Sequence, residues 1–226
     1  MYSAVILSGG RGSRMAKQVP KQYLLLAGKP MIMHTIERLD CIAEIDEIVI
    51  VCEEEFISGL NLMLRQYGIT KKVRYAPAGT TRQESVYNGI KDISNKFVIV
   101  HEAARPFVLK KDFLKLVNDL EENVTFGYPI PFTVLKGSDC IEELLNRSEL
   151  FNVQLPQKFN TEDLKNAHIK AREENRAYTE DAGMLFDICH KRVKILHGNS
   201  YNIKITEPID LCLGEVIYKE YITGDC

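Results

Sequence analysis

The stretch Ala4–Leu24, AVILSGGRGSRMAKQVPKQYL, joins an apolar run to a loop rich in glycine and basic residues. The apolar run Ala4–Leu7 predicts a buried strand, because its residues are aliphatic and a turn-forming segment follows at once. The loop Ser8–Met15 then lies at the carboxyl end of that strand. Open α/β sheets bind their ligands at this end of their strands. The stretch therefore predicts an α/β protein with a ligand site beside its first strand.

The same alternation of short apolar runs and helical patterns continues along the chain. Further strands are predicted at Glu47–Cys52, Val73–Ala76, Phe97–His101 and Val193–Leu196. Helices are predicted at Met31–Leu39, Phe56–Arg65, Arg82–Ile90, Lys111–Glu121, Glu162–Arg172 and Asp181–His190, with a last one within Pro208–Tyr221. Strands that alternate with helices favour a three-layer, Rossmann-like α/β fold with a mostly parallel sheet.

This alternation breaks down between Tyr128 and Gln157. Two strand-like stretches surround a polar middle there, and prolines bound them. We interpret residues 130–156, approximately, as a β-arm that protrudes from the sheet. No linker or repeat interrupts the rest of the chain, so residues 1–226 are expected to form a single domain with this arm.

Charge and composition exclude several classes of protein. The 226 residues carry 29 Lys and Arg against 31 Asp and Glu, a net charge of −2, so no basic excess indicates a nucleic-acid partner. No apolar run reaches the roughly 18 residues that a membrane helix needs. The six cysteines are widely spaced and form no metal-binding pattern, which favours free thiols. We expect a soluble cytoplasmic protein that binds neither nucleic acid nor a membrane.

The loop after the first strand has the composition of a phosphate-binding site. Gly9, Gly10 and Gly12 allow the backbone to approach a ligand closely, and successive N–H groups in such a loop can bind an anion. Arg14 and Lys21 add two cations. The loop matches neither the GxxxxGK[ST] pattern nor the GxGxxG pattern. A phosphate loop of another kind and a plain glycine turn both remain open at this point.

Six blocks spread over the whole chain match one family in their order. They are LSGGRGSRM with PKQYL, GTTRQESV (Gly79–Val86), VHEAARPF (Val100–Phe107), LPQKF (Leu155–Phe159), YTEDAGML (Tyr178–Leu185) and NIKIT (Asn202–Thr206). In these blocks the chain resembles the nucleotidyltransferases of the 2-C-methyl-D-erythritol 4-phosphate cytidylyltransferase family, which includes related ribitol-5-phosphate cytidylyltransferases. The resemblance implies their fold and a homodimer that exchanges its β-arms. It also implies a reaction in which CTP and a polyol phosphate give a CDP-polyol and pyrophosphate.

The resemblance also implies which residues carry this reaction. The acceptor phosphate would attack the α-phosphorus of CTP, and three cations would stabilise the transition state: Arg14, Lys21 and Lys204. The residues implied to bind CTP are Ser8, Gly9, Gly10, Gly12, Gly79, Thr80, Arg82 and Ser85. Mg²⁺ is expected as the cofactor, held mainly by phosphate oxygens, with Glu102 as a protein ligand.

For the acceptor, the resemblance implies Glu102, Arg105, Thr133 and Arg147. Arg147 would come from the partner subunit, because the arm would reach across the dimer. Some of the motif residues also have a simple structural interpretation. The block GTTRQESV is typical of a helix start that Thr80 or Thr81 caps, with Glu84 closing a capping box. The structural and the ligand-binding roles are compatible, since helix starts often meet anions.

Three positions depart from the family pattern. Glu102 stands where the family usually has Asp, Leu155 where it usually has Thr, and Thr179-Glu180-Asp181 where it usually has Thr-Asp. The acceptor therefore stays open between methylerythritol phosphate, used in isoprenoid biosynthesis, and ribitol or glycerol phosphate, used for cell-surface polymer precursors. Two other functions stay open as well: a catalytically silent nucleotide-binding subunit and a sugar-1-phosphate nucleotidyltransferase.

Overall fold

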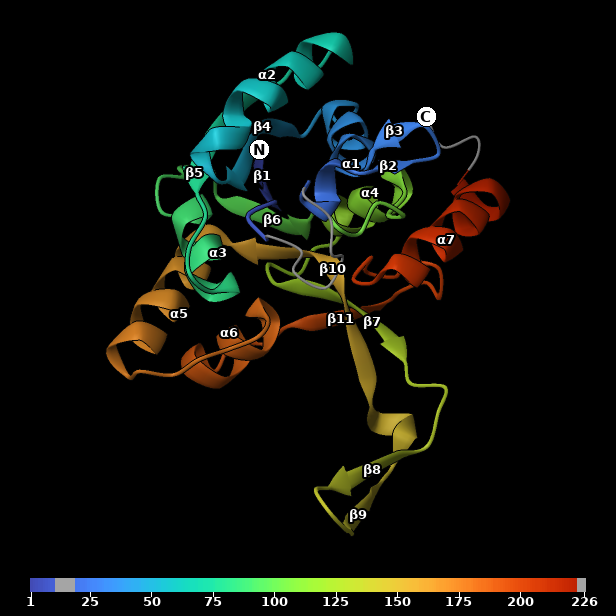
Figure 1. Ribbon diagram of the computed structural model, residues 1–226. Coiled ribbons are helices and arrows are strands. Elements are labelled where there is room, and N and C mark those ends of the chain that lie inside the picture. The colour runs from blue at the N-terminus through green and yellow to red at the C-terminus, as the bar shows by residue number, and fades with distance from the viewer. Residues whose placement is uncertain (11–18, 223–226) are drawn as a thin grey trace.

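The computed structural model of the chain describes residues 1–10 and 19–222. Within them, seven strands form one sheet in the order β11-β7-β10-β6-β1-β4-β5 (Figure 1). They are β1 (Tyr2–Leu7), β4 (Ile45–Cys52), β5 (Lys72–Pro77), β6 (Phe97–Glu102), β7 (Val124–Pro129), β10 (Phe151–Asn160) and β11 (Lys194–His197). β10 runs antiparallel to both of its neighbours, and the other neighbouring pairs are parallel. The mostly parallel sheet predicted from the sequence is confirmed.

Helices cover both faces of this sheet, because successive side chains of a strand point to opposite faces. Val5 of β1 belongs to the apolar cluster on one face, and its neighbour Ile6 belongs to the cluster on the other. The first face carries α3 (Arg82–Ile90), α5 (Thr161–Glu173) and α6 (Asp181–Cys189), and the second carries α1 (Met31–Asp40), α2 (Ile57–Gln66) and α4 (Lys110–Asn118). The predicted three layers are therefore confirmed.

A third apolar cluster holds the last helix, α7 (Pro208–Ile217), against the body of the molecule. Ile205, just before this helix, is fully buried with Phe107 and with Leu26 of the short strand β2 (Leu25–Leu26). β2 pairs with β3 (Lys29–Pro30) in a small hairpin that the sequence pattern did not predict. This cluster fixes the segment before α7, which carries Lys204.

The fourth predicted helix, Lys111–Glu121, is shorter than expected. α4 ends at Asn118, and Asp119 is extended, with φ −71° and ψ 137°. Its carbonyl accepts a hydrogen bond from Lys158 at 2.8 Å, and its carboxylate pairs with Lys194 at 2.7 Å. These two lysines come from distant strands and fix the chain direction at Asp119. As a result Leu120, which falls within the predicted helix range, lies outside α4 and is 99% exposed.

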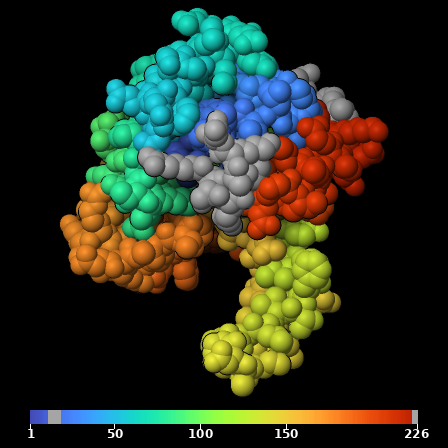
Figure 2. All heavy atoms as spheres, in the orientation of Figure 1, coloured from blue at the N-terminus to red at the C-terminus, as the bar shows by residue number. Residues whose placement is uncertain are grey.

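The arm is a two-stranded hairpin that stands away from the body (Figures 1 and 2). Its strands are β8 (Val134–Gly137) and β9 (Ile141–Leu145). β10 then returns from the arm into the central sheet, where it lies between β6 and β7, and its residues 154–159 are buried. β7 was not predicted as a strand. The hairpin itself carries exposed apolar side chains: Phe132, Leu135, Ile141 and Leu144.

Among the described residues, none of the helices combines the length and the apolar character that crossing a membrane requires.

Candidate active site

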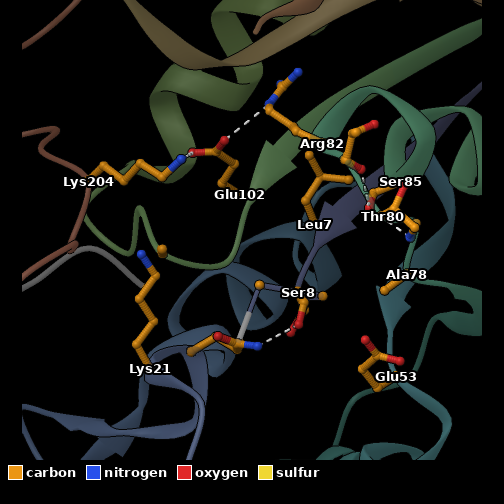
Figure 3. A pocket seen from close by; sticks show the side chains of 16 residues that line it. Leu7, Ser8, Lys21, Glu53, Ala78, Thr80, Arg82, Ser85, Glu102 and Lys204 are labelled. Carbon is orange, nitrogen blue, oxygen red and sulfur yellow. Dashed lines mark hydrogen bonds and ion pairs between the residues drawn. The ribbon is translucent and has the colours of Figure 1, made fainter. Parts of the chain in front are cut away.

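A cavity of about 600 Å³ opens at the carboxyl ends of β1, β4, β5 and β6 (Figure 3). This is the edge of the sheet at which the sequence predicted a ligand. Its lining includes Leu7, Ser8, Gly9, Gly10, Lys21, Gln22, Glu53, Ala78, Gly79, Thr80, Thr81, Arg82, Ser85, Glu102, Ala104 and Lys204. The structure thus brings together most of the residues predicted to bind CTP. Gly12 and Arg14 lie outside the described residues.

The start of the glycine loop is held tightly against the neighbouring strands. The N–H of Ser8 donates to the carbonyl of Val51 at 2.8 Å, and the carbonyl of Ser8 accepts from Gln22 at 2.5 Å. Gly9 lies so close to Ala78 that a Cβ on Gly9 would be 2.4 Å from the Ala78 Cβ. A glycine is therefore required at position 9 by packing, because this contact joins the two loops that form opposite walls of the cavity.

The second wall is the loop between β5 and α3, whose polar groups bond to one another. Thr81 caps α3 by accepting from the N–H of Glu84 at 3.1 Å. The Glu84 carboxylate accepts from the N–H and the hydroxyl of Thr80, each at 2.7 Å. The N–H of Gly79 donates to the Ser85 hydroxyl at 3.0 Å, and that hydroxyl donates to the Thr81 carbonyl at 2.9 Å. Thr81 is thus the cap, and Glu84 bonds the residue before it instead of closing a capping box.

Three cations surround the carboxylate of Glu102 at the next strand end. Lys204 lies 2.9 Å from it, Arg82 3.2 Å and Arg105 3.4 Å. Burial by itself would raise the pKa of Glu102, but the charges of Lys204, Arg82 and Arg105 outweigh burial and lower it to about 2. Glu102 is therefore ionised at neutral pH and holds Lys204 and Arg82 at the cavity (Figure 3).

Two residues that the sequence did not assign extend this cluster into the interior. Asp181 pairs with Arg82 at 2.8 Å and with the ring of His168 at 3.4 Å. Asp181 is 1% exposed; burial would raise its pKa, yet the charges and hydrogen bonds of Arg82 and His168 lower it to about 2. The carboxylate in the block YTEDAGML was the available signal for Asp181. Nothing in the sequence pattern indicated His168, which lies on α5.

The departure at Thr179-Glu180-Asp181 has a clear structural use. Glu180 is the cap of α6, and its carboxylate accepts from the N–H groups of Ala182 and Gly183. It also accepts from the side chain of Gln157 at 3.0 Å. One acid therefore caps the helix while the next one, Asp181, turns inward to Arg82.

The lysines of the cavity come from opposite parts of the chain. Lys21 begins a short 3₁₀ helix, Lys21–Tyr23, directly after Pro20. Lys204 lies before α7, and its neighbour Ile205 donates a backbone hydrogen bond to Ala104 at 2.8 Å. Figure 3 shows both side chains on the same side of the cavity. The fold therefore brings two lysines from distant parts of the chain to one side of the cavity.

The residues predicted for the acceptor do not all lie together in one chain. Arg105 is mostly buried and donates to the carbonyl of Asn202 at 3.1 Å, beside the cavity and not in its lining. Thr133 and Arg147 lie in the arm, where they border a separate hollow of about 450 Å³. Arg147 donates to the carbonyl of Pro131 at 3.0 Å. Leu155 turns its side chain into the apolar core and lines neither hollow.

The side chains of the cavity determine how the expected Mg²⁺ could be held. No group of three or more His, Cys, Asp or Glu side chains among the described residues is placed to hold a metal ion. Glu102, the predicted protein ligand, is already engaged by three cations. These residues fit a Mg²⁺ held mainly by the phosphate oxygens of a bound nucleotide, in the way this ion commonly binds.

Comparison with known proteins identifies the same family that the six sequence blocks resemble. The family model for 2-C-methyl-D-erythritol 4-phosphate cytidylyltransferase matches residues 2–220. A protein of that description from Clostridium botulinum (strain Okra / Type B1) is 35% identical, with 96% of this chain and 97% of the relative covered. A ribitol-5-phosphate cytidylyltransferase from Lactiplantibacillus plantarum is 29% identical, with 97% of this chain and 99% of the relative covered.

A solved structure extends the similarity to the fold. The crystal structure of 4-diphosphocytidyl-2C-methyl-D-erythritol synthase from Anaerococcus prevotii superimposes with a TM-score of 0.85 at 27% sequence identity. The alignment covers 96% of each chain, so the mostly parallel sheet and its flanking helices match a known fold.

Proposed function

This chain belongs to the 2-C-methyl-D-erythritol 4-phosphate cytidylyltransferase family, and we infer that its cavity transfers a cytidylyl group from CTP to a polyol phosphate. The products are a CDP-polyol and pyrophosphate. The observation that carries the inference is the cavity itself, in which two glycine-containing loops face Lys21 and Lys204. A catalytically silent subunit would need neither lysine. The presence of both lysines in the lining supports the activity of the family in this chain.

We propose that the cations of the cavity hold the triphosphate and stabilise the transition state. The acceptor phosphate and CTP are both strongly negative, so the reaction depends on positioning and on charge stabilisation. Lys21 and Lys204, together with Arg14, would neutralise the charge that develops around the α-phosphorus. Glu102 supports this role because its ionised carboxylate holds Lys204 in place before the nucleotide binds.

The base is proposed to lie between the two loops that form opposite walls of the cavity. Ser8, Gly9 and Gly10 would contact it from one side, and Gly79, Thr80 and Ser85 from the other, all of them in the lining. Arg82, also in the lining, joins this wall to Glu102. The close contact between Gly9 and Ala78 keeps the space between the walls narrow. A narrow slot favours a single pyrimidine ring over a purine.

The acceptor is proposed to bind where the arm of one subunit meets the cavity of the other. Thr133 and Arg147 are near each other in the arm, as a phosphate site requires, but they do not line the cavity of their own chain. A homodimer that exchanges its arms would add them to the partner's Glu102 and Arg105. The exposed apolar side chains of the arm support such a contact. A single domain with a dimerisation arm and a cytoplasmic location stay predictions.

Two acceptors are proposed, and each has a supporting relative. The 35% identity to a methylerythritol phosphate enzyme favours 2-C-methyl-D-erythritol 4-phosphate. A ribitol-5-phosphate enzyme aligns with 97% of this chain at 29% identity, so ribitol phosphate is the second candidate. Glycerol phosphate is proposed with it as a related alditol phosphate. Mg²⁺ is proposed to accompany the triphosphate and to reduce its negative charge, with Glu102 as its candidate protein ligand. Chelation with EDTA should then stop the reaction, and added Mg²⁺ should restore it.

The deciding experiment measures pyrophosphate release with each nucleotide and each acceptor. CTP, UTP, ATP and GTP are combined in turn with methylerythritol, ribitol, glycerol and xylitol phosphates. We expect release with CTP and with one acceptor far above the others. Absence of release from CTP with every acceptor would contradict the proposed function.

A further inference from the structure

Glu53 lies in the cavity at a position that the reaction described so far does not use. It directly follows β4, and β4 lies between β1 and β5 in the sheet. The loops after β1 and β5 are the two walls proposed to hold the base. Figure 3 shows the carboxylate of Glu53 turned toward the space between Ser8 and Ala78, and Glu53 is part of the cavity lining. An acid therefore lies at the end of the slot between the walls.

The charged side chains of the described lining differ between the two sides of the cavity. Lys21 and Lys204 lie on one side of it, and Glu53 lies on the opposite side (Figure 3). A nucleoside triphosphate has the same division, because one end carries the negative phosphates and the other carries a neutral base. A carboxylate repels phosphates and is a strong acceptor for N–H groups. This arrangement favours a nucleotide whose phosphates lie toward the lysines and whose base lies toward Glu53.

Several hydrogen-bond donors of the wall between β5 and α3 are already used. Among the described residues, the N–H of Gly79 and the hydroxyl of Ser85 donate within the loop, and so do the N–H and hydroxyl of Thr80. Glu53 adds a carboxylate, which has room for several donors. The acceptors at this end of the cavity therefore include a carboxylate.

Cytosine and uracil differ in the group that would meet these acceptors. Cytosine carries an N4 amino group, which donates, whereas uracil carries the O4 oxygen, which accepts. We propose that Glu53 accepts a hydrogen bond from the N4 amino group of CTP and rejects UTP by repulsion from O4. Aspartate and glutamate read cytosine through this same amino group in nucleic-acid complexes. Glu53 is then a specificity-determining residue of the proposed cytidylyltransferase reaction, on which this inference rests.

The test replaces Glu53 by an amide of the same shape. In Glu53→Gln the side chain can turn its NH₂ group toward O4, so the ratio of kcat/KM for CTP to that for UTP should fall at least about 10-fold. Glu53→Ala should lower the same ratio through loss of turnover with CTP. The matched control is Glu54→Gln, because Glu54 is the next acid along the chain, is exposed and is not part of the lining.

Equilibrium titration with CTP and UTP measures the same preference without turnover. A CTP preference that is unchanged in Glu53→Gln in both assays would overturn the inference. So would a variant that keeps this preference but loses discrimination between CTP and dCTP, because Glu53 would then contact the ribose. Wild-type protein that prefers CTP in the titration yet releases no pyrophosphate would contradict the proposed function. The effect of Glu53→Gln on the titration would still decide the role of Glu53.

Discussion

Lys204 is held at the cavity by a single carboxylate that other charges keep ionised. Glu102 is 7% exposed, and a buried carboxylate without partners would favour its neutral form. Lys204, Arg82 and Arg105 together prevent this by lowering its pKa, and Glu102 binds Lys204 at 2.9 Å. Asp181 in turn neutralises Arg82 from the other side. The position of one lysine therefore depends on a chain of buried charges.

The lysines of the cavity are expected to matter for the transition state more than for folding. Lys21→Ala and Lys204→Ala should each lower kcat by at least about 100-fold, the scale of losing one contact to the developing charge. Steady-state pyrophosphate release measures this effect. Lys170→Ala, an exposed lysine on α5, is the control and should keep full turnover. Normal kcat in both cavity variants would mean that these lysines do not touch the reacting groups.

Stability should decrease as the solution becomes mildly acidic, because of buried histidines. Burial lowers the pKa of His101 to about 4, while an unfolded histidine titrates near about 6.5. The unfolded chain therefore takes up a proton that the folded chain refuses. The free energy of unfolding should be highest above about pH 6.5 and should fall toward pH 4, by up to about 1.4 kcal/mol per pH unit for one histidine.

Urea unfolding between pH 7.5 and 5 tests the role of His101. His101→Gln should reduce the change in the free energy of unfolding per pH unit. The pH dependence that remains should come from His34, because burial also lowers the pKa of His34 to about 4. His190 is exposed, so His190→Asn should leave the slope as it is. A slope that is the same in wild type and His101→Gln would contradict the assignment.

At the scale of elements, the cavity exists because two loops approach each other over the end of β4. The loop after β1 and the loop before α3 touch at Gly9 and Ala78. The second loop is held by its own hydrogen bonds, among them the cap that Thr81 gives to α3. The width of the slot is thus set by where β1 ends and where α3 begins.

Widening this slot is expected to damage nucleotide binding. In Gly9→Ala the new methyl group would meet the Ala78 Cβ at 2.4 Å, so one loop must shift. Displacements of about 1 Å can reduce turnover about 100-fold, and we expect the KM for CTP to rise about 10-fold or more. Gly59→Ala on α2 is the control, because its methyl group would find no atom within 4 Å. An unchanged KM in Gly9→Ala would show that the slot does not hold CTP.

At the scale of the whole molecule, the arm exposes apolar side chains that a single chain does not bury. Its hairpin stands apart from the body and exposes Ile141 and Leu144 to 70% and 69% (Figure 2). Water contact on this scale is unfavourable for a monomer, and a partner subunit would remove it. The proposed exchange of arms would also complete the acceptor site.

Mixing two impaired variants at an acceptor concentration below the raised KM can test this exchange. Arg147→Ala should raise the KM for the acceptor far more than the KM for CTP, and Lys204→Ala should lose turnover. If arms are exchanged, a mixed dimer contains one site with both Lys204 and Arg147 intact. Co-expression or refolding of the two variants together should then restore activity above that of either alone. A mixture that stays as inactive as its parts would contradict a shared site.

The sequence by itself determined the alternating strands and helices and the edge of the sheet at which the cavity opens. These features follow from local periodicity and from glycine-rich loops at strand ends, which depend on neighbouring residues only. The six ordered blocks also indicated the family. The helix at Arg82–Ile90 was predicted with the bounds that α3 has.

Only the tertiary structure decided how distant segments meet. β10 enters the sheet between β6 and β7, antiparallel to both, because the arm reverses the chain before it returns. The partners of Arg82 are 20 and 99 residues away in sequence, at Glu102 and Asp181. No spacing rule predicts such pairs, since burial and charge balance in the folded chain select them. The role proposed for Glu53 likewise became visible only when Lys21 and Lys204 proved to lie on the opposite side of the cavity.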